Sequence, residues 1–121
     1  MNSDKMNFED RCGKWKKILQ MMEQENSHLH LKLQEARSYH KPLSEHGLKH
    51  FENRLVNQEK IIGLLASQLD DLCDSYEKEG AHNLPVFTEK MKSFKTDIDR
   101  CAQLFSRLTT QFKAYLEEYN K

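Results

Sequence analysis

The sequence predicts a small, soluble, all-α protein that forms an antiparallel up-down-up bundle of three long, heptad-patterned helices, similar to a coiled coil. Three observations support this fold class. Apolar residues recur at heptad spacing along most of the chain, the pattern slips at two short segments that contain proline, and the 121 residues include only four Gly and two Pro. A chain of 14.4 kDa fits a single domain, 1–121.

Alternating steps of three and four residues connect the apolar positions into three stripes. The first stripe contains Phe8, Cys12, Trp15, Leu19, Met22, Asn26, Leu29, Leu33, Ala36 and His40. The second contains Leu48, Phe51, Leu55, Gln58, Ile62, Leu65, Leu69, Leu72, Tyr76 and Glu79. The third contains Leu84, Phe87, Met91, Phe94, Ile98, Cys101, Phe105, Leu108, Phe112, Tyr115 and Tyr119. These are the a and d positions of three heptads, which face a common core.

The breaks between the stripes predict where the helices begin and end. Pro42 follows the first stripe, and Ser44 is a possible N-cap for the second helix. Gly80 favours a helix stop, and Asn83 with Pro85 favours a new helix start. We therefore expect helices over about 4–38, 43–80 and 84–120, each roughly 50 Å long. Short connections make neighbouring helices antiparallel.

The charge balance excludes some classes of protein. With 19 basic and 19 acidic residues the net charge is zero, and a protein that binds duplex nucleic acid usually has a basic excess. No stretch is apolar enough for a transmembrane helix, and the start of the chain does not resemble a secretory signal. The three widely spaced cysteines predict no disulfide framework, which favours a reducing, cytoplasmic location.

Charge is also distributed unevenly along the predicted helices. The end of the second helix is acidic, with Asp70, Asp71, Asp74, Glu77 and Glu79. In an antiparallel bundle it lies level with the basic starts of the other helices, which contain Arg11, Lys14, Lys16, Lys17, Lys90, Lys92 and Lys95. This placement favours the up-down-up order, although the charges also suit a solvated outer face.

Two polar residues, Asn26 and Gln58, interrupt the stripes at similar heights, close to that of Cys101. We interpret them as a candidate polar layer in the core that fixes helix register, as a buried Asn does in coiled coils. The alternative is that each side chain leans to the edge of the bundle and meets water.

The sequence contains no catalytic or cofactor motif that we can identify. His46 and His50 have the i, i+4 spacing of metal ligands, but no acidic residue lies between them in the manner of zinc proteases, and solvated surface histidine is the simpler interpretation. The inward positions lack the Glu-x-x-His pairs of di-iron bundles. Cys12 and Cys101 fit small core residues, and Cys73 lies beside the stripe. We therefore expect a protein that is not an enzyme and needs no cofactor, metal or small-molecule substrate.

Apolar residues at outward heptad positions suggest a contact surface. Met21, Leu31, Val56 and Leu64 occupy the c, f, b and c positions, and we take them as a candidate interaction surface along the first two helices. Singly exposed apolar residues are also normal. Ile18, Ile61 and Leu104 at g positions widen the stripes, which suits a bundle enlarged by a dimer or by a partner helix.

In size, helix number and periodicity the chain is similar to spectrin-like three-helix modules and to small helical export chaperones and adaptors of bacteria. The sequence therefore favours protein–protein contact, either as a self-assembling scaffold that forms a homodimer or as an adaptor. An alternative is a small export-chaperone-like or regulatory protein that binds an amphipathic helix of a partner. An accessory nucleic-acid- or membrane-associated factor that uses the basic start of the first helix is a less favoured alternative.

Overall fold

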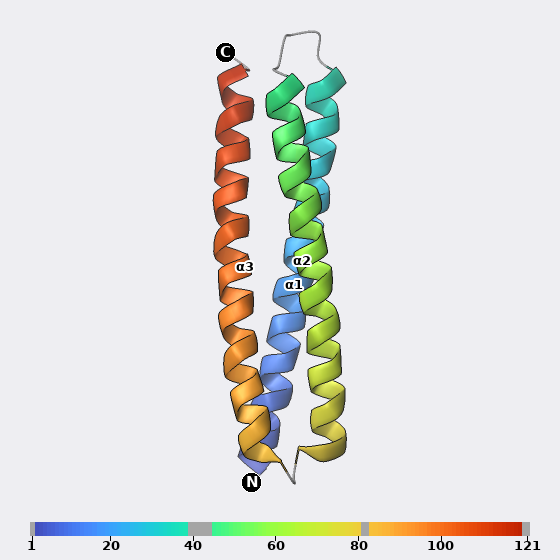
Figure 1. The fold of residues 1–121 in the computed structure, drawn as a ribbon, viewed down its shortest axis with the longest axis vertical. Helices are drawn as coiled ribbons and strands as arrows, with labels where there is room; N and C mark the ends of the chain where they lie inside the picture. Colours follow the sequence, from blue (N-terminus) through green and yellow to red (C-terminus); the bar gives the residue numbers. More distant parts are fainter. Residues whose placement is uncertain (1, 39–44, 81–82, 120–121) are drawn as a thin grey trace.

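The computed structural model describes residues 2–38, 45–80 and 83–119, without the side chains of 2–7 and 119. These residues form three helices, α1 over Asn2–Ser38, α2 over Glu45–Glu79 and α3 over Leu84–Tyr119. The helices lie side by side along one long axis, with α1 and α3 running in the same direction and α2 in the opposite one (Figure 1). The described residues contain no strand. The all-α, up-down-up three-helix bundle expected from the sequence is confirmed.

The helix boundaries agree with the sequence to within two residues. At the start of α3 the carbonyl of Asn83 accepts hydrogen bonds from the amides of Val86 at 3.1 Å and Phe87 at 3.2 Å, as an N-cap carbonyl does. Pro85 is the second residue of α3, where its missing N–H costs nothing. The expected roles of Pro42 and Ser44 and the inward position of His40 lie outside the described residues.

The buried core follows the three stripes. Apart from Gly80, every residue in the buried class among the described residues lies at a predicted a or d position. Glu79 and Leu84 were expected on the stripes but are exposed, and Tyr115 is half-buried. All three lie in the first or last turns of a helix, where neighbouring helices provide less cover.

Aromatic rings fill both ends of this core. At the lower end, where α2 ends, Phe8 stacks on Tyr76 with ring centroids 3.7 Å apart, and Phe87 packs edge-on against Tyr76 at 5.5 Å. Gly80 allows this packing, because a Cβ there would lie 2.5 Å from the Tyr76 ring. At the upper end, where α2 begins, Phe51 packs against Phe112 and Tyr115.

The three helix pairs do not pack equally. The contact between α1 and α2 is the most extensive, and that between α1 and α3 is the smallest. In the part of the chain that the structure describes, no helix has the length and apolar character needed to cross a membrane.

Candidate interaction surface and core polar layer

Asn26 and Gln58 are both buried in the middle of the bundle, with exposed fractions of 2% and 5%. The side-chain amide of Asn26 on α1 donates to the carbonyl of Leu55 on α2 at 3.2 Å. The amide of Gln58 on α2 donates to the carbonyl of Cys101 on α3 at 3.4 Å and lies 3.1 Å from its Sγ. The two side chains thus link α1 to α2 and α2 to α3, rather than leaning to the edge. Their role in helix register stays a prediction.

The buried polar groups of this layer are not fully satisfied. Oδ1 of Asn26 accepts no hydrogen bond from the described residues, and such an unpaired buried acceptor costs about 1–3 kcal/mol. Burial raises the pKa of the Cys101 thiol, and the hydrogen bond from Gln58 only partly opposes this shift. Cys101 is therefore a neutral thiol at pH 7, as expected for a core cysteine.

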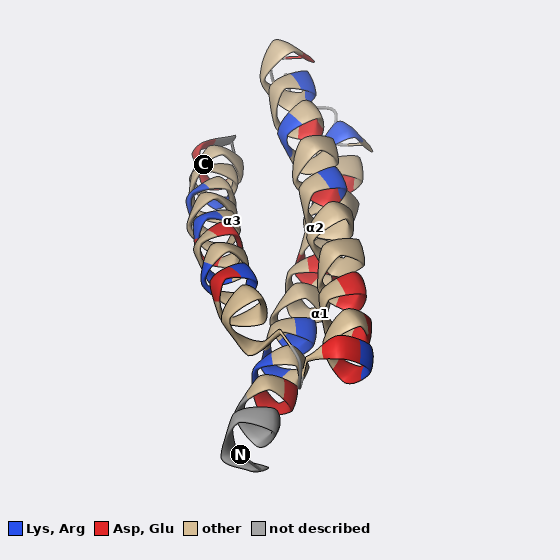
Figure 2. Cartoon of the chain, turned by 60° about the horizontal axis from the view of Figure 1, so that its bottom comes forward, with Lys and Arg blue, Asp and Glu red and all other residues tan. Residues whose placement is uncertain are grey.

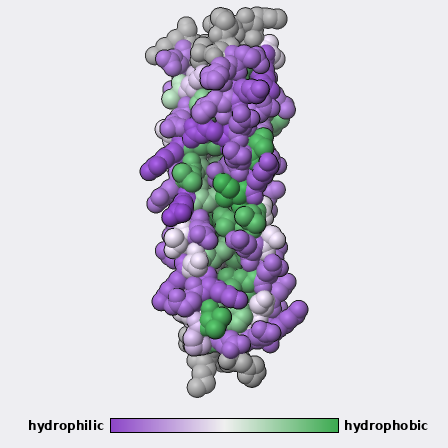
Figure 3. All heavy atoms as spheres, viewed as in Figure 1, coloured by the Kyte–Doolittle hydropathy of each residue, from purple (hydrophilic) through white to green (hydrophobic). Residues whose placement is uncertain are grey.

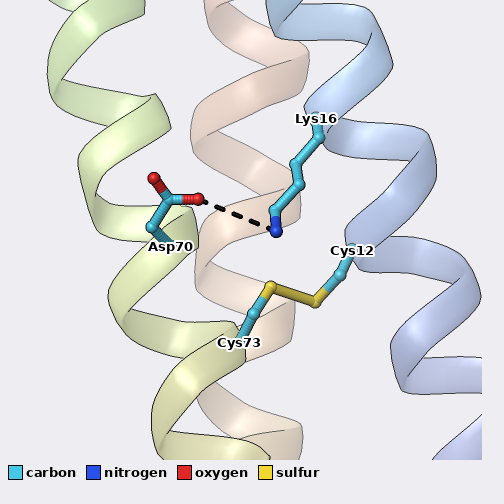
Figure 4. The surroundings of a disulfide bond; sticks show 4 residues. All are labelled: Cys12, Lys16, Asp70 and Cys73. Atoms are coloured by element: carbon cyan, nitrogen blue, oxygen red, sulfur yellow. Dashed lines mark ion pairs between the residues drawn. A yellow bond between two sulfur atoms is a disulfide. The ribbon is translucent and has the colours of Figure 1, made fainter.

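The expectation that no cysteines pair is wrong. Cys12 on α1 and Cys73 on α2 form a disulfide, with Cα atoms 6.6 Å apart (Figure 4). The bond joins residues separated by 61 positions. Closing a loop of that length lowers the conformational entropy of the unfolded chain, which stabilises the fold by about 4 kcal/mol. Cys73 occupies an e position, beside the apolar stripe and next to α1. Cys101 is the free cysteine.

The sequence contains one signal for this pair, which is the equal distance of the two cysteines from the first break between the stripes. Cys12 and Cys73 lie 30 and 31 residues from Pro42, so an antiparallel turn centred there places them at the same height. Equal height is necessary for a disulfide, but it does not decide which flank of α2 faces α1.

Ion pairs mark the flank between α1 and α2. Arg37 on α1 forms a hydrogen-bonded ion pair with Glu52 on α2. Lys16 lies 3.7 Å from Asp70, one helical turn above the disulfide (Figure 4). Arg37 and Lys16 are at e positions of α1, and their partners Glu52 and Asp70 are at e and b positions of α2. The side of α2 that contains the e and b positions therefore faces α1.

The lower end of the bundle brings acidic and basic residues together only in part. Figure 2 shows the acidic end of α2 close to the basic start of α1. Within the described residues, Lys16 and Asp70 make the ion pair between helices at this end. On α3, Lys92 pairs with Glu89 and Lys95 with Asp99, both within the helix. Among the described contacts, the α3 lysines therefore do not pair with the acidic end of α2.

The flank between α2 and α3 carries a short apolar strip. Arg54 of α2 donates to Gln111 of α3 at 2.5 Å, and both are at g positions. One heptad further along, Ile61 therefore lies opposite Leu104. Ile61, Leu64 and Leu104, which we call the α2–α3 strip, are 40%, 59% and 45% exposed. Figure 3 shows hydrophobic residues along the middle of the face on which α2 and α3 lie.

The four residues taken from the sequence as an interaction surface are not on one flank. Met21, Leu31 and Leu64 are exposed, and Val56 is half-buried. Val56, at b, lies on the side of α2 that faces α1, whereas Leu64, at c, lies toward α3. Met21, at c of α1, points away from α2. The α2–α3 strip shares Leu64 with the original set and adds two of the g-position residues.

A groove runs along the α1–α2 flank. It encloses about 410 Å³ and is lined by Lys16, Leu19, Gln20, Glu23, Asn26, Ser27, Glu59, Ile62, Gly63, Ala66 and Asp70. Its floor consists of Leu19, Asn26 and Ile62, and its walls include the small residues Ser27, Gly63 and Ala66. Three of its four charged residues are acidic.

The histidines do not gather into a metal site in the described part of the chain. His46 and His50 are both exposed, and no group of three or more His, Cys, Asp or Glu there has the arrangement of metal ligands. His82 lies outside the described residues.

Comparison with protein-family models, with curated proteins and with solved structures finds no match to this chain. The residues and their geometry therefore carry the functional argument alone.

We predict that replacing Asn26 and Gln58 together by Leu weakens the specificity of the fold. Removing the unpaired Oδ1 of Asn26 relieves its cost, but the hydrogen bonds that select one register are lost. The double variant should show broadened amide signals in NMR spectra or a changed mass in light scattering. An unchanged mass, with sharper unfolding at a higher temperature, would contradict a role in register.

A second prediction concerns Glu52. Its hydrogen bond to Arg37 lowers the pKa of its carboxyl below the ordinary 4.5, against a smaller opposing effect of desolvation. Ionised Glu52 therefore stabilises the fold above that ordinary pKa, and the contribution is lost as the pH falls through the lowered pKa. In denaturant titrations, Glu52→Gln should be less stable than the parent at neutral pH, and the difference should shrink on acidification and in high salt.

The matched control is Glu35→Gln, which changes an exposed carboxylate of α1 that has no ion pair among the described contacts. It should follow the parent across the same pH range. Parallel curves for Glu52→Gln and the parent from pH 6 to pH 3 would show that the pair contributes nothing.

Proposed function

We propose that this chain is a non-enzymatic helical-bundle protein that acts through protein–protein contact, and that its partner is a second copy of itself. The observation that carries the proposal is the α2–α3 strip of Ile61, Leu64 and Leu104. These side chains border the core seam between two helices, so they extend the buried apolar surface outward instead of lying singly on the surface.

A homodimer suits this geometry. An isologous contact about a two-fold axis sets the strip of one protomer against the same strip of the other. The α2 and α3 helices of the two protomers then pack together as four helices. A stable interface needs about 800 Å² from each partner, which is more than three side chains supply. The contact must therefore extend along neighbouring heptads. Arg54, Gln68 and Asp97, at g positions above and below the strip, would form the polar rim of such an interface.

A second candidate is an adaptor that binds an amphipathic helix of another protein. The groove between α1 and α2 supports it, because small residues on its walls allow close approach of another backbone. Its acidic residues, Glu23, Glu59 and Asp70, favour a basic segment as the occupant. This candidate uses the opposite flank of α2 from the α2–α3 strip, so the two can be tested separately.

The cytoplasmic location predicted from unpaired cysteines has lost its main support. Disulfides persist in oxidising compartments and are usually transient or redox-active in the cytosol. A cytoplasmic location therefore requires that the bond between Cys12 and Cys73 is reversibly reduced there.

The dimer is tested by light scattering after size exclusion over a tenfold dilution. We expect a mass of about 29 kDa, twice that of the chain. Ile61→Gln combined with Leu104→Gln should shift the mass toward that of the monomer. The matched control, Ile18→Gln with Met21→Gln, changes two exposed apolar residues on the other side of the bundle and should remain dimeric.

A 14.4 kDa monomer at every concentration would contradict the homodimer. Equal masses for the strip variant and its control would show that dimerisation, if present, uses a different surface. Binding of a basic helical peptide by such a monomer, weakened by Gly63→Leu in the groove, would favour the adaptor instead.

A further inference from the structure

The disulfide lies near one end of the bundle rather than in its middle. Cys12 occupies an a position and is buried, whereas Cys73 occupies an e position and is only partly buried. Both cysteines line an opening of about 230 Å³ on the α1–α2 flank, together with Gly13 and Glu77. A Cβ on Gly13 would meet no atom within 4 Å, so the α1 side of this opening is not crowded. A small thiol can therefore approach the sulfur of Cys73 from solvent.

Few of the described core residues lie below the bond. In the described part of the chain, the layer beneath it consists of Phe8, Tyr76 and Phe87, one residue from each helix. The layer above contains Trp15, which packs against Phe94 with ring centroids 5.0 Å apart. Among the described side chains, the disulfide thus separates one terminal layer from the continuous core, and it is a covalent connection between α1 and α2 at this end.

We propose that Cys12 and Cys73 form a reversible dithiol–disulfide site whose reductant is a protein or small-molecule dithiol, and that reduction loosens the Phe8–Tyr76–Phe87 layer. The inference does not depend on the proposed homodimer. The aromatic layer is held by stacking and by the bond above it, so it is the first part of the core to open when the bond is lost. Reduction would expose three aromatic rings at one end of the bundle.

The chemistry is a two-electron exchange. A thiolate of the dithiol attacks Sγ of Cys73, the less buried of the two cysteines, and the Cys12–Cys73 bond breaks as a mixed disulfide forms. Cys12 leaves as a thiolate and takes up a proton. The second thiolate of the reductant then attacks the reductant sulfur that is bonded to Cys73 in the mixed disulfide. This step releases Cys73 as a thiolate, which is protonated in turn. The products are two cysteine thiols and the oxidised, cyclic disulfide of the reductant.

The geometry also favours the reverse reaction. The remaining layers of the bundle hold the two backbones at the same height, so the thiols stay close after reduction. Cys101 cannot compete, because it is buried on α3 beneath Gln58. Oxidation should therefore restore the same pair and no other.

The test uses the full chain equilibrated with reduced and oxidised dithiothreitol in native buffer. Alkylation followed by intact mass and peptide analysis counts free thiols, and hydrogen exchange reports local opening. We expect Cys12 and Cys73 to become alkylated together after reduction. Amides near Phe8 and Tyr76 should then exchange about tenfold faster or more, whereas those around Ile98–Phe105 should change little.

Two variants serve as matched controls. Cys12→Ser with Cys73→Ser should exchange at its lower end like the reduced parent under both conditions, and Cys101→Ser should retain the redox response. If the double variant fails to fold, the reduced parent still provides the comparison.

Three results would overturn the proposal. Free Cys12 and Cys73 in protein kept under oxidising conditions would show that the bond does not form. A bond that dithiothreitol reduces only in denaturant would be a permanent structural connection. Identical exchange in the reduced and oxidised forms would show that the bond does not control the terminal layer.

Discussion

The structure depends on confining its apolar residues to one narrow seam on each helix. Only 37% of the residues are hydrophobic, so a core can form only if the seams of all three helices meet along their whole length. The result is a long, thin core in which each layer consists of roughly one residue from each helix. A polar side chain in such a layer is shielded from water, so its hydrogen-bond partners must come from the facing helices. Asn26 and Gln58 accordingly donate to backbone carbonyls of those helices.

The three helices are connected to one another in different ways. Between α1 and α2 lie a disulfide, the Arg37–Glu52 and Lys16–Asp70 ion pairs and the Asn26 hydrogen bond. The polar links of α3 to α2 include the Arg54–Gln111 hydrogen bond and the contacts of Gln58 with Cys101. The apolar seam of α3, which is rich in Phe, provides most of its packing. Thus α1 and α2 form a constrained hairpin, and the flank that carries exposed apolar residues is the one shared with α3.

Periodicity predicts some of these features and not others. The seams, the helix ends and the inward positions of Asn26 and Gln58 follow from residue spacing, because a helix converts spacing directly into a face. Residue spacing does not predict which flanks of neighbouring helices meet, because two bundles of opposite handedness have the same seams. Handedness decides whether the e side of α2 faces α1 or α3. It therefore decides whether Cys73 can reach Cys12, and which of Val56 and Leu64 lies on the side of α2 that faces α1.

The relative direction and register of the seams can be tested through the single tryptophan of the chain. Trp15 contacts Phe94 only if α1 and α3 run in the same direction at the observed height. The account predicts nuclear Overhauser effects between the rings of Trp15 and Phe94 that persist when labelled protein is diluted with unlabelled chain. Effects from Trp15 to Phe112 instead, or effects to Phe94 that disappear on isotopic dilution, would contradict the single-chain up-down-up bundle.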